Sequence, residues 1–406
     1  MGKEVEKVQK KERLKIVYVF NGFSEKMGYT SNCLPKAVAA LGHEVHVIAP
    51  NVQVYYNAPF YKETYEQFLG PPITEIGSKQ IDGFTLHRLP HKNFKTEVDI
   101  EGLKDKIKEL KPDIVHTFHL NSIITIKLAW YKLLYGYKFF TGNHVVLSVF
   151  PLHNNWKNLS WRAKLTWNIK HKLSGRLISL LTSKCYPATI DAKLIATDYY
   201  GIPDHKCIIA PIGVSSDVFT PERNKNRETF LSRFGFDPGD LICVYTGRFT
   251  ESKNPLILAK AIDLVSKRNP KVKGLFIGKG EQKEAIESCQ NCKVSDFMPS
   301  DELPLVYQNA FLGIWPREES MSMLDAISTG LPIIVSDQMK AKERIDGNGL
   351  TYIEKDFEDL AKQIEKLIQD SNLYQQFSET GAKKIENSYS WNSIALERIK
   401  NYEDAL

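Results

Sequence analysis

Arg248 and Lys253 are the two residues of this sequence whose types and spacing best suit chemistry. They follow an apolar run, residues 241–246, that is typical of a buried strand. Arginine presents a planar fork of hydrogen-bond donors and lysine a compact positive charge, and both bind phosphate oxygens. A helix expected to begin near Asn254 adds backbone N–H groups and the positive end of its dipole. The pair therefore indicates a diphosphate site, the alternative being two solvated side chains on a surface loop.

A second polar group follows the strand expected at 311–315. Two carboxylates stand at the turn, where they can accept hydrogen bonds from sugar hydroxyls. The helix expected at 322–328 offers the free N–H groups of its first turn to a phosphate or sugar oxygen. Ordinary helix capping by the two serines, with the aspartate as its complement, is the alternative, and both interpretations can hold together. The group consists of Glu318, Glu319, Ser320, Ser322 and Asp325.

Weaker candidates lie at three other predicted strand ends. Gly278 begins a Gly-x-Gly that lets the backbone approach a ligand, although a simple turn explains it equally well. His116 and His119 have a spacing that suits metal ligands, but the sequence offers no apparent third ligand. His144, beside Asn143 in a strand-end loop, is the better candidate for an active-site residue.

The carboxylate pattern does not favour a metal-dependent reaction. No Asp-x-Asp occurs in the 406 residues, and sugar-transfer sites that use a divalent ion usually need paired carboxylates to hold it. The six cysteines are scattered, and the single Cys-x-x-Cys lacks a second pair at zinc-site spacing. We therefore expect no metal and no cofactor, with Arg248, Lys253 and helix dipoles offsetting the charge of a leaving diphosphate.

Two α/β cycles must position these residues. Strand-like apolar runs alternate with helical patterns along the chain, which predicts parallel sheets. The first cycle begins with the strand at 15–20 and includes a short strand expected at 73–76. The second cycle begins after Pro221, so we place the break between the cycles at 212–221.

Residues 154–173 form a basic segment in which three tryptophans alternate with lysine and arginine. Such a helix can lie on anionic lipid with its tryptophans inserted, the alternative being a lid helix that packs them on the core. The tryptophans are Trp156, Trp161 and Trp167.

The net charge of +6 is mild, and no nucleic-acid reader motif accompanies it. The first dozen residues lack the apolar core of a signal peptide. We therefore expect a cytoplasmic protein, with peripheral contact to the inner face of a membrane as a hypothesis.

Three stretches of the second half resemble a known family. They are residues 211–219, residues 245–249 with Lys253, and residues 325–332. The sequence is similar there to the interdomain linker, the diphosphate-binding "GR…K" and the second half of the Glu, seven residues, Glu motif of the retaining group 1 glycosyltransferases, family 4. The resemblance implies the GT-B fold, an α/β architecture of two Rossmann-like domains whose parallel sheets face an interdomain cleft. The domains would be 1–213, completed by a helix at 391–406, and 214–390.

The resemblance also implies a role for each candidate residue. The donor would be a nucleotide sugar, with UDP- or GDP-sugars expected, and the acceptor a hydroxyl of a glycan or lipid-linked glycan, as in cell-surface polysaccharide or glycolipid synthesis. Arg248 and Lys253 would hold the diphosphate, Asp325 the ribose, Glu318 or Glu319 the donor sugar, and His144 would lie beside the transferred sugar. The donor-binding residues implied in full are Gly28, Gly247, Arg248, Lys253, Gly278, Phe297, Met298, Glu318, Glu319, Ser320, Met321, Ser322 and Asp325.

Departures from the family pattern keep alternatives open. The second Glu is replaced by Asp325. Arg317 occupies the position expected for the first Glu, with seven residues between it and Asp325, whereas only five residues separate Glu319 from Asp325. A nucleotide-sugar epimerase or a sugar phosphorylase of the same fold, or a nucleotide-sugar-binding module without catalysis, would carry much of the same sequence. Binding to nucleic acid is not expected.

Overall fold

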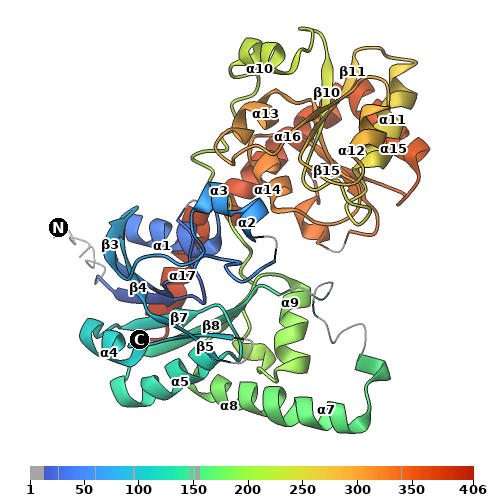
Figure 1. Cartoon of the computed structure of the whole chain (residues 1–406). Helices are drawn as coiled ribbons and strands as arrows, with labels where there is room; N and C mark the ends of the chain where they lie inside the picture. Colours follow the sequence, from blue (N-terminus) through green and yellow to red (C-terminus); the bar gives the residue numbers. More distant parts are fainter. Residues whose placement is uncertain are drawn as a thin grey trace, which may run out of the picture. The chain divides into compact units, whose positions relative to one another are not determined.

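A computed structural model describes residues 13–25, 27–59, 61–94, 97–145, 147, 150, 156–339 and 341–406, without the side chains of residues 63, 64, 94 and 157. The chain divides into two compact units (Figure 1). Unit 1 consists of the described parts of Met1–Ile212 together with Ile394–Leu406, and unit 2 is Gly213–Ser393. Each unit is described by itself.

Unit 1 is built on a seven-stranded sheet with the order β3-β4-β2-β1-β7-β8-β9. All neighbours are parallel except the β3–β4 pair. The central strands are buried along almost their whole length, because helices cover both faces of a parallel sheet. The strands are β1 (Lys15–Val19), β2 (Glu44–Pro50), β3 (Gly77–Ile81), β4 (Phe84–Leu89), β7 (Ile114–Thr117), β8 (Lys138–Asn143) and β9 (Cys185–Pro187), with β5 (His91–Phe94) and β6 (Glu97–Ile100) forming a separate hairpin.

The strand expected at 73–76 was placed wrongly. Ile73 forms only an isolated bridge with Val52, and the strand is β3, which begins at Gly77. β3 is largely polar and exposed, so it has no apolar alternation for a sequence pattern to detect. It is an edge strand that forms because β4 offers it an antiparallel partner.

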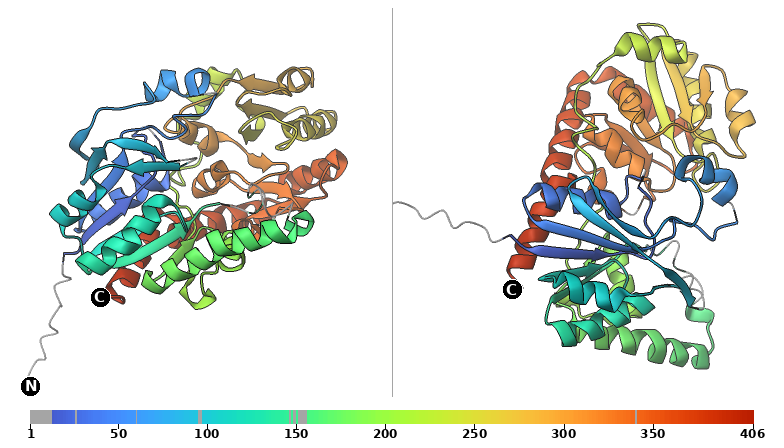
Figure 2. Two further views of the ribbon diagram at one scale, coloured as in Figure 1. Left: turned by 60° about the horizontal axis from the view of Figure 1, so that its bottom comes forward. Right: turned by 60° about the vertical axis from the view of Figure 1, so that its left-hand side comes forward.

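The helices of unit 1 flank this sheet (Figures 1 and 2). Ser122 caps α5 by accepting a hydrogen bond from the Thr125 amide at 3.2 Å. The α7 helix continues through a π-helical turn into α8 without a break. The helices are α1 (Thr30–Ala40), α2 (Tyr61–Thr64), α3 (Glu66–Leu69), α4 (Leu103–Leu110), α5 (Ile123–Tyr135), α7 (Trp161–Trp167), the π turn (Asn168–Leu173), α8 (Ser174–Leu181), α9 (Ile190–Leu194), short turns at Trp156–Asn158, Ile195–Tyr199 and Asp204–Lys206, and α17 (Trp391–Glu403), which belongs to unit 1 from Ile394 onward.

The last helix completes the core of unit 1. The Tyr402 hydroxyl lies 2.6 Å from Nδ1 of His116 on β7, and both side chains are fully buried. The Arg398 guanidinium stacks over the Tyr186 ring at 3.5 Å. His116 therefore has a structural role, as the buried hydrogen-bond partner of Tyr402. Burial also holds its pKa well below the ordinary value, so the imidazole stays neutral.

Unit 2 is a six-stranded, fully parallel sheet with the order β12-β11-β10-β13-β14-β15. Numbered along the unit this is 3-2-1-4-5-6, the doubly wound Rossmann order. The strands are β10 (Leu241–Thr246), β11 (Val272–Ile277), β12 (Cys292–Ser295), β13 (Leu312–Trp315), β14 (Ile333–Ser336) and β15 (Gly349–Tyr352). The helices are α10 (Arg227–Phe234), α11 (Pro255–Ser266), α12 (Lys283–Glu287), α13 (Leu303–Asn309), α14 (Met321–Ser328), α15 (Phe357–Gln369), α16 (Ser371–Lys384), a 3₁₀ turn (Lys342–Arg344) and a π turn (Ile385–Tyr389).

Candidate functional site

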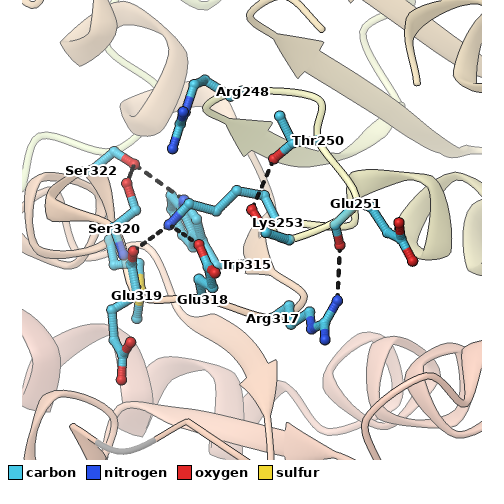
Figure 3. A network of polar contacts seen from close by, with 12 residues as sticks. Arg248, Thr250, Glu251, Lys253, Trp315, Arg317, Glu318, Glu319, Ser320 and Ser322 are labelled. Atoms are coloured by element: carbon cyan, nitrogen blue, oxygen red, sulfur yellow. Dashed lines mark hydrogen bonds and ion pairs between the residues drawn. The ribbon is translucent and has the colours of Figure 1, made fainter. Parts of the chain in front are cut away.

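The switch point of unit 2 lies between β10 and β13, which are adjacent parallel strands separated by two crossover cycles in the sequence. Ligands of doubly wound sheets bind in the crevice at the carboxyl ends of the strands at this point. The loop after β10 carries Arg248 and Lys253, and the loop after β13 carries Glu318 and Glu319. The two polar groups predicted from the sequence are therefore brought to one place (Figure 3).

Lys253 connects the two loops. Its Nζ donates to the Glu319 carbonyl oxygen at 2.7 Å and lies 3.2 Å from Oε2 of Glu318. The side chain is only 17% exposed. An ammonium group has three N–H donors, so two are used by the protein and one remains for a ligand. The charge is thus held at a fixed point of the switch-point crevice.

Arg248 contributes a second cation at the same strand end. Its backbone carbonyl accepts a hydrogen bond from the Tyr245 hydroxyl at 2.9 Å, which fixes the loop. The guanidinium is exposed and forms no hydrogen bond or ion pair with any residue that the structure describes. Figure 3 shows the side chain extended toward the turn that holds Ser320 and Ser322. A guanidinium without a protein partner is available to a ligand anion.

The first turn of α14 is fixed against the end of β10 by a buried tryptophan. Trp315 Nε1 lies 3.2 Å from the Thr246 carbonyl oxygen and 3.1 Å from the Ser322 hydroxyl. The Ser322 and Ser320 hydroxyls are 2.7 Å apart, and Ser320 is the residue that precedes the helix. The serines therefore stabilise the helix start, which lies beside the two cations (Figure 3).

Glu318 and Glu319 take different positions. Glu318 is 46% exposed and pairs with Lys253, whereas Oε1 of Glu319 accepts a hydrogen bond from the Ala341 amide at 3.3 Å. Arg317 lies beside them, but its guanidinium bonds the Glu251 carbonyl at 3.1 Å and Glu354 at 3.4 Å. Of the two glutamates, Glu318 is the one whose carboxylate lies at the Lys253 ammonium.

Asp325 lies one turn into α14, and its carboxyl is buried. Its carboxyl forms no hydrogen bond or ion pair with the described residues. Burial raises its pKa from 3.8 to about 7, because the charged form loses its hydration. A buried carboxyl group whose pKa lies near neutral pH is typical of functional sites.

Gly278 and Gly280 bring the loop after β11 against the loop after β10. A Cβ on Gly278 would lie 1.9 Å from the Gly247 carbonyl oxygen, and one on Gly280 would lie 2.5 Å from the Phe249 carbonyl oxygen. Both glycines have φ values near +150°, at +148° and +153°. The close contact between the two loops requires glycine at both positions. Through that contact the loop after β11 supports the loop that carries Arg248.

Phe297 and Met298 follow the next strand, β12. The Phe297 side chain is 71% exposed, while Met298 is buried in the core of unit 2. Met298 therefore anchors the segment, and Phe297 presents a free aromatic ring at the strand end.

Comparisons with known proteins agree with this geometry. Residues 226–384 match the family model of "Glycosyl transferases group 1". The glycosyltransferase of Rickettsia africae ESF-5 has the same fold with a TM-score of 0.68, at 16% identity over 97% of this chain and 98% of that one. Anabaena Alr3699/HepE, solved in complex with UDP, gives a TM-score of 0.66 at 12% identity over 96% and 100%. The alpha-monoglucosyldiacylglycerol synthase of Acholeplasma laidlawii is 23% identical over 320 residues, 74% of each chain.

Residues 226–384 are those of a group 1 glycosyltransferase, and the chain has the GT-B fold of the solved glycosyltransferases. The α/β architecture and the family resemblance seen in the sequence are both confirmed.

His144 and Gly28 of this glycosyltransferase belong to unit 1. The half-buried His144 ring has its centroid 5.2 Å from that of Phe118, and burial lowers its pKa to about 4. The imidazole is therefore neutral at physiological pH and can bond a hydroxyl without carrying charge. Asn143 is fixed beside it by a 2.9 Å hydrogen bond to the Ala192 carbonyl. Gly28 is exposed, and a Cβ there would meet nothing within 4 Å.

The tryptophans of the glycosyltransferase's basic segment do not all face solvent, and for two of them the packing alternative holds. Trp167 donates to the Tyr199 carbonyl at 3.1 Å, and the Trp156 ring packs edge-on against Tyr199 at 5.3 Å. Trp161 alone among the three is well exposed, at 69%. Two of the tryptophans therefore pack on the chain because Tyr199 and its neighbours supply partners that a helical pattern does not reveal. Residues 154 and 155 and the side chain of Lys157 lie outside the described residues.

The structure does not place His116 and His119 in a cluster of metal ligands among the described residues. His119 is half-buried and its pKa is lowered to about 4 by burial. No group of three or more His, Cys, Asp or Glu side chains within the described residues could hold a metal ion.

The sequence analysis did not identify Tyr307. Its buried hydroxyl lies 2.7 Å from the Thr246 hydroxyl at the end of β10. Its position in a helix pattern gave no signal for that contact.

Proposed function

We propose that this glycosyltransferase moves a sugar from a nucleoside-diphosphate sugar to an acceptor hydroxyl, with retention of anomeric configuration and without a metal ion. The observation that carries the proposal is the placement of Arg248 and Lys253 at the switch point of unit 2. The UDP complex of the Anabaena relative supports a uridine nucleotide as the donor, with GDP as the alternative. The absence of Asp-x-Asp from the sequence supports metal-independent chemistry.

The donor residues have separate roles in this proposal. The diphosphate lies against the Arg248 guanidinium, the free donor of Lys253 and the start of α14, while Gly247 lets the loop pass close to it. Asp325 accepts hydrogen bonds from the ribose hydroxyls, and the ring of Phe297 flanks the base above Met298. The sugar is bound by Glu318, with Glu319 fixing the turn. The start of α14 is formed by Ser320, Met321 and Ser322.

The reaction requires one bond to break and one to form at the anomeric carbon. The bond to the leaving diphosphate oxygen breaks, and the acceptor oxygen bonds to the same face of the sugar. The acceptor proton passes to the departing phosphate oxygen. Arg248 and Lys253 stabilise the charge that develops on the diphosphate, which lowers the barrier more than it strengthens donor binding. In unit 1, neutral His144 bonds a hydroxyl of the transferred sugar, and Gly28 leaves space for the acceptor.

The acceptor is proposed to be a glycan or a lipid-linked glycan at the cytoplasmic face of a membrane. The name of the Acholeplasma relative describes the synthesis of a diacylglycerol glycolipid, which supports a lipid-bearing acceptor. No helix among the described residues has the length and apolar character to cross a bilayer. Such an acceptor would have to be reached from the membrane surface.

Release of nucleotide from a panel of UDP- and GDP-sugars tests the proposal when it is measured in excess EDTA with candidate acceptors. We expect release with one nucleotide family only, and proton NMR of the product should show the donor's anomeric configuration. An inverted product would overturn retention, and activity abolished by EDTA but restored by Mg²⁺ would overturn metal independence. Conversion of the donor without any acceptor would instead indicate an epimerase, and a requirement for phosphate a phosphorylase.

The donor affinity is expected to fall as the pH drops below about 7. Asp325 retains its proton up to that pH, and only the carboxylate can accept from both ribose hydroxyls. About one pH unit below the pKa, roughly a tenth of the protein carries the carboxylate, so Kd rises about ten-fold. Calorimetric titration with the nucleotide from about pH 5 to about pH 8 measures this. Asp325→Asn should bind weakly with no such slope, and an unchanged slope in that variant would exclude Asp325.

The same pKa has an opposite consequence for stability. The folded-state pKa of Asp325 lies above its ordinary value of 3.8, so the folded protein binds the proton more tightly than the unfolded chain. Its contribution to stability is therefore present below about pH 4 and is lost as the pH rises toward 7. In Asp325→Asn, which cannot titrate at this position, the free energy of unfolding should not show this decrease.

A further inference from the structure

We propose that unit 1 docks on an anionic lipid bilayer through the outer side of α5 and of the continuous α7–α8 helix. This surface is called the docking face below. This inference rests on the proposed function, because docking would give the enzyme access to a lipid-linked acceptor. It differs from the sequence hypothesis in the residues involved, since leucine and isoleucine replace two of the three tryptophans.

A row of large apolar side chains faces solvent on the docking face. Six residues of the α7–α8 helix are between 49% and 70% exposed, namely Trp161, Leu165, Ile169, Leu173, Leu177 and Leu180. On α5, Ile126, Trp130 and Leu133 are 45%, 62% and 59% exposed. Single exposed apolar residues are ordinary, but a continuous row of this size on a soluble surface marks an interaction site.

The helix geometry keeps this row on one side. The apolar residues recur every four positions from Trp161 to Leu177, and a regular α-helix would carry such a row gradually around its axis. The π turn at Asn168–Leu173 takes more residues per turn and offsets part of that rotation. Trp167 and Ile178, on the opposite side, pack on the chain. The helix is therefore amphipathic over its whole length.

The two helices lie side by side. α5 packs against α8, and both views of Figure 2 show the green α7–α8 helix running along the same side of unit 1 as the teal α5. The Asn121 amide, just before α5, donates to the Ser174 hydroxyl at the start of α8 at 2.7 Å. The exposed apolar residues of the docking face therefore come from two neighbouring helices.

The charge around the docking face is of one sign. The sequence has no Asp or Glu from Ile114 to Ile190, and it has ten Lys and Arg in that stretch. Two acids lie near the start of α5, but Asp99 pairs with Lys127 at 2.5 Å and Glu97 accepts from the Ile123 amide at 2.7 Å. The charge of Asp99 is thus compensated by Lys127, and Glu97 is bound to the start of α5.

Several of these cations have no acidic partner. Lys170, Lys172 and Arg176 alternate with the apolar row, and none of them forms an ion pair with a described residue. Arg162 lies over the Trp161 ring at 5.5 Å, an arrangement that places a charge and an aromatic ring at the same level. An apolar stripe bordered by lysine and arginine is the pattern of helices that lie in the headgroup region of anionic membranes.

A second copy of the chain is a poorer occupant of this surface. A two-fold contact between docking faces would set the basic stretch of one copy against that of the other. No acid in residues 114–190 is available to compensate those charges. An anionic bilayer provides both the apolar interior and the opposite charge.

Co-sedimentation with vesicles tests the proposal on the full-length protein. We expect binding to phosphatidylcholine vesicles that contain phosphatidylglycerol, weaker binding at high salt, and little binding to phosphatidylcholine alone. The variant Leu165→Ser with Leu177→Ser should lower the partition coefficient about ten-fold or more. Lys170→Gln with Arg176→Gln should lower it about thirty-fold, since each basic residue near an anionic surface contributes roughly five-fold.

Ile76→Ser with Ile353→Ser is the matched control, because both isoleucines are 58% exposed but lie outside the docking face. It should bind vesicles like the wild type. Equal loss in this control, or no binding by the wild type, would overturn the proposal. A solution dimer that the leucine variant dissociates, without vesicle binding, would assign the face to a second copy. Thermal stabilisation by nucleotides, measured without vesicles, should persist in every variant, so that failure of docking is distinguished from failure of the donor site.

Discussion

Replacing Lys253 with alanine is expected to lower kcat by on the order of 10² or more, because the variant loses a positive charge aimed at the leaving diphosphate. The Nζ is held between the Glu319 carbonyl and Glu318, so its position needs no reorganisation when charge develops on the phosphate oxygen. Donor KM should change less than kcat, since the interaction strengthens in the transition state. Steady-state release of nucleotide measures both constants.

Two further measurements make that result interpretable. Lys267→Ala removes another ion-paired lysine, next to the far end of α11, where it lies 3.7 Å from Asp263, and should leave kcat unchanged. The unfolding temperature of Lys253→Ala should stay close to that of the wild type, because Glu318, the partner left behind, is 46% exposed. Turnover within a few-fold of the wild type in a folded Lys253→Ala protein would exclude the proposed role.

Gly278→Ala is expected to destabilise unit 2 by about 3 kcal/mol and to weaken donor binding. The added Cβ would lie 1.9 Å from the Gly247 carbonyl oxygen, and that neighbour is backbone, which cannot move aside as a flexible side chain can. The φ of +148° adds strain for any residue with a side chain. Relief of the clash must displace the loop that carries Arg248, so stability and affinity should fall together.

Denaturant unfolding followed by fluorescence measures the stability change, and titration with nucleotide measures the affinity. Gly28→Ala is the control for stability, because a Cβ there meets nothing within 4 Å. It should unfold at the same denaturant concentration as the wild type. A Gly278→Ala protein of wild-type stability would show that the two loops are not packed as described.

The part of the candidate site that could be predicted from the sequence depends on strand ends. Buried parallel strands are recognisable as apolar runs, and all of their carboxyl ends lie on one edge of the sheet. Arg248 and Lys253 after β10, and the glutamates after β13, therefore came together as expected. β3 was misplaced for the same reason, because a polar edge strand has no apolar run.

What could not be predicted depends on contacts between distant segments. Which glutamate faces Lys253 is decided by the turn after β13 and by the Ala341 amide, 22 residues from Glu319. The orientation of Trp156 and Trp167 is decided by Tyr199, more than 30 residues along the chain. The raised pKa of Asp325 comes from burial, which its position in a helix pattern does not reveal. Residue types and spacing indicate where chemistry lies, whereas tertiary packing decides the role of each side chain.

The most direct test of the central claim is a thermal-shift panel with UDP, GDP, ADP, CMP and their common sugar conjugates, measured without metal on the wild type and Lys253→Ala. We expect stabilisation by one nucleotide family, because a ligand that binds only the folded protein raises its unfolding temperature. That stabilisation should be smaller in Lys253→Ala, which loses one contact to the diphosphate, although binding should weaken by a smaller factor than kcat falls. A wild-type protein that responds to none of these nucleotides, or a variant that responds as strongly as the wild type, would contradict a donor site at the switch point of unit 2.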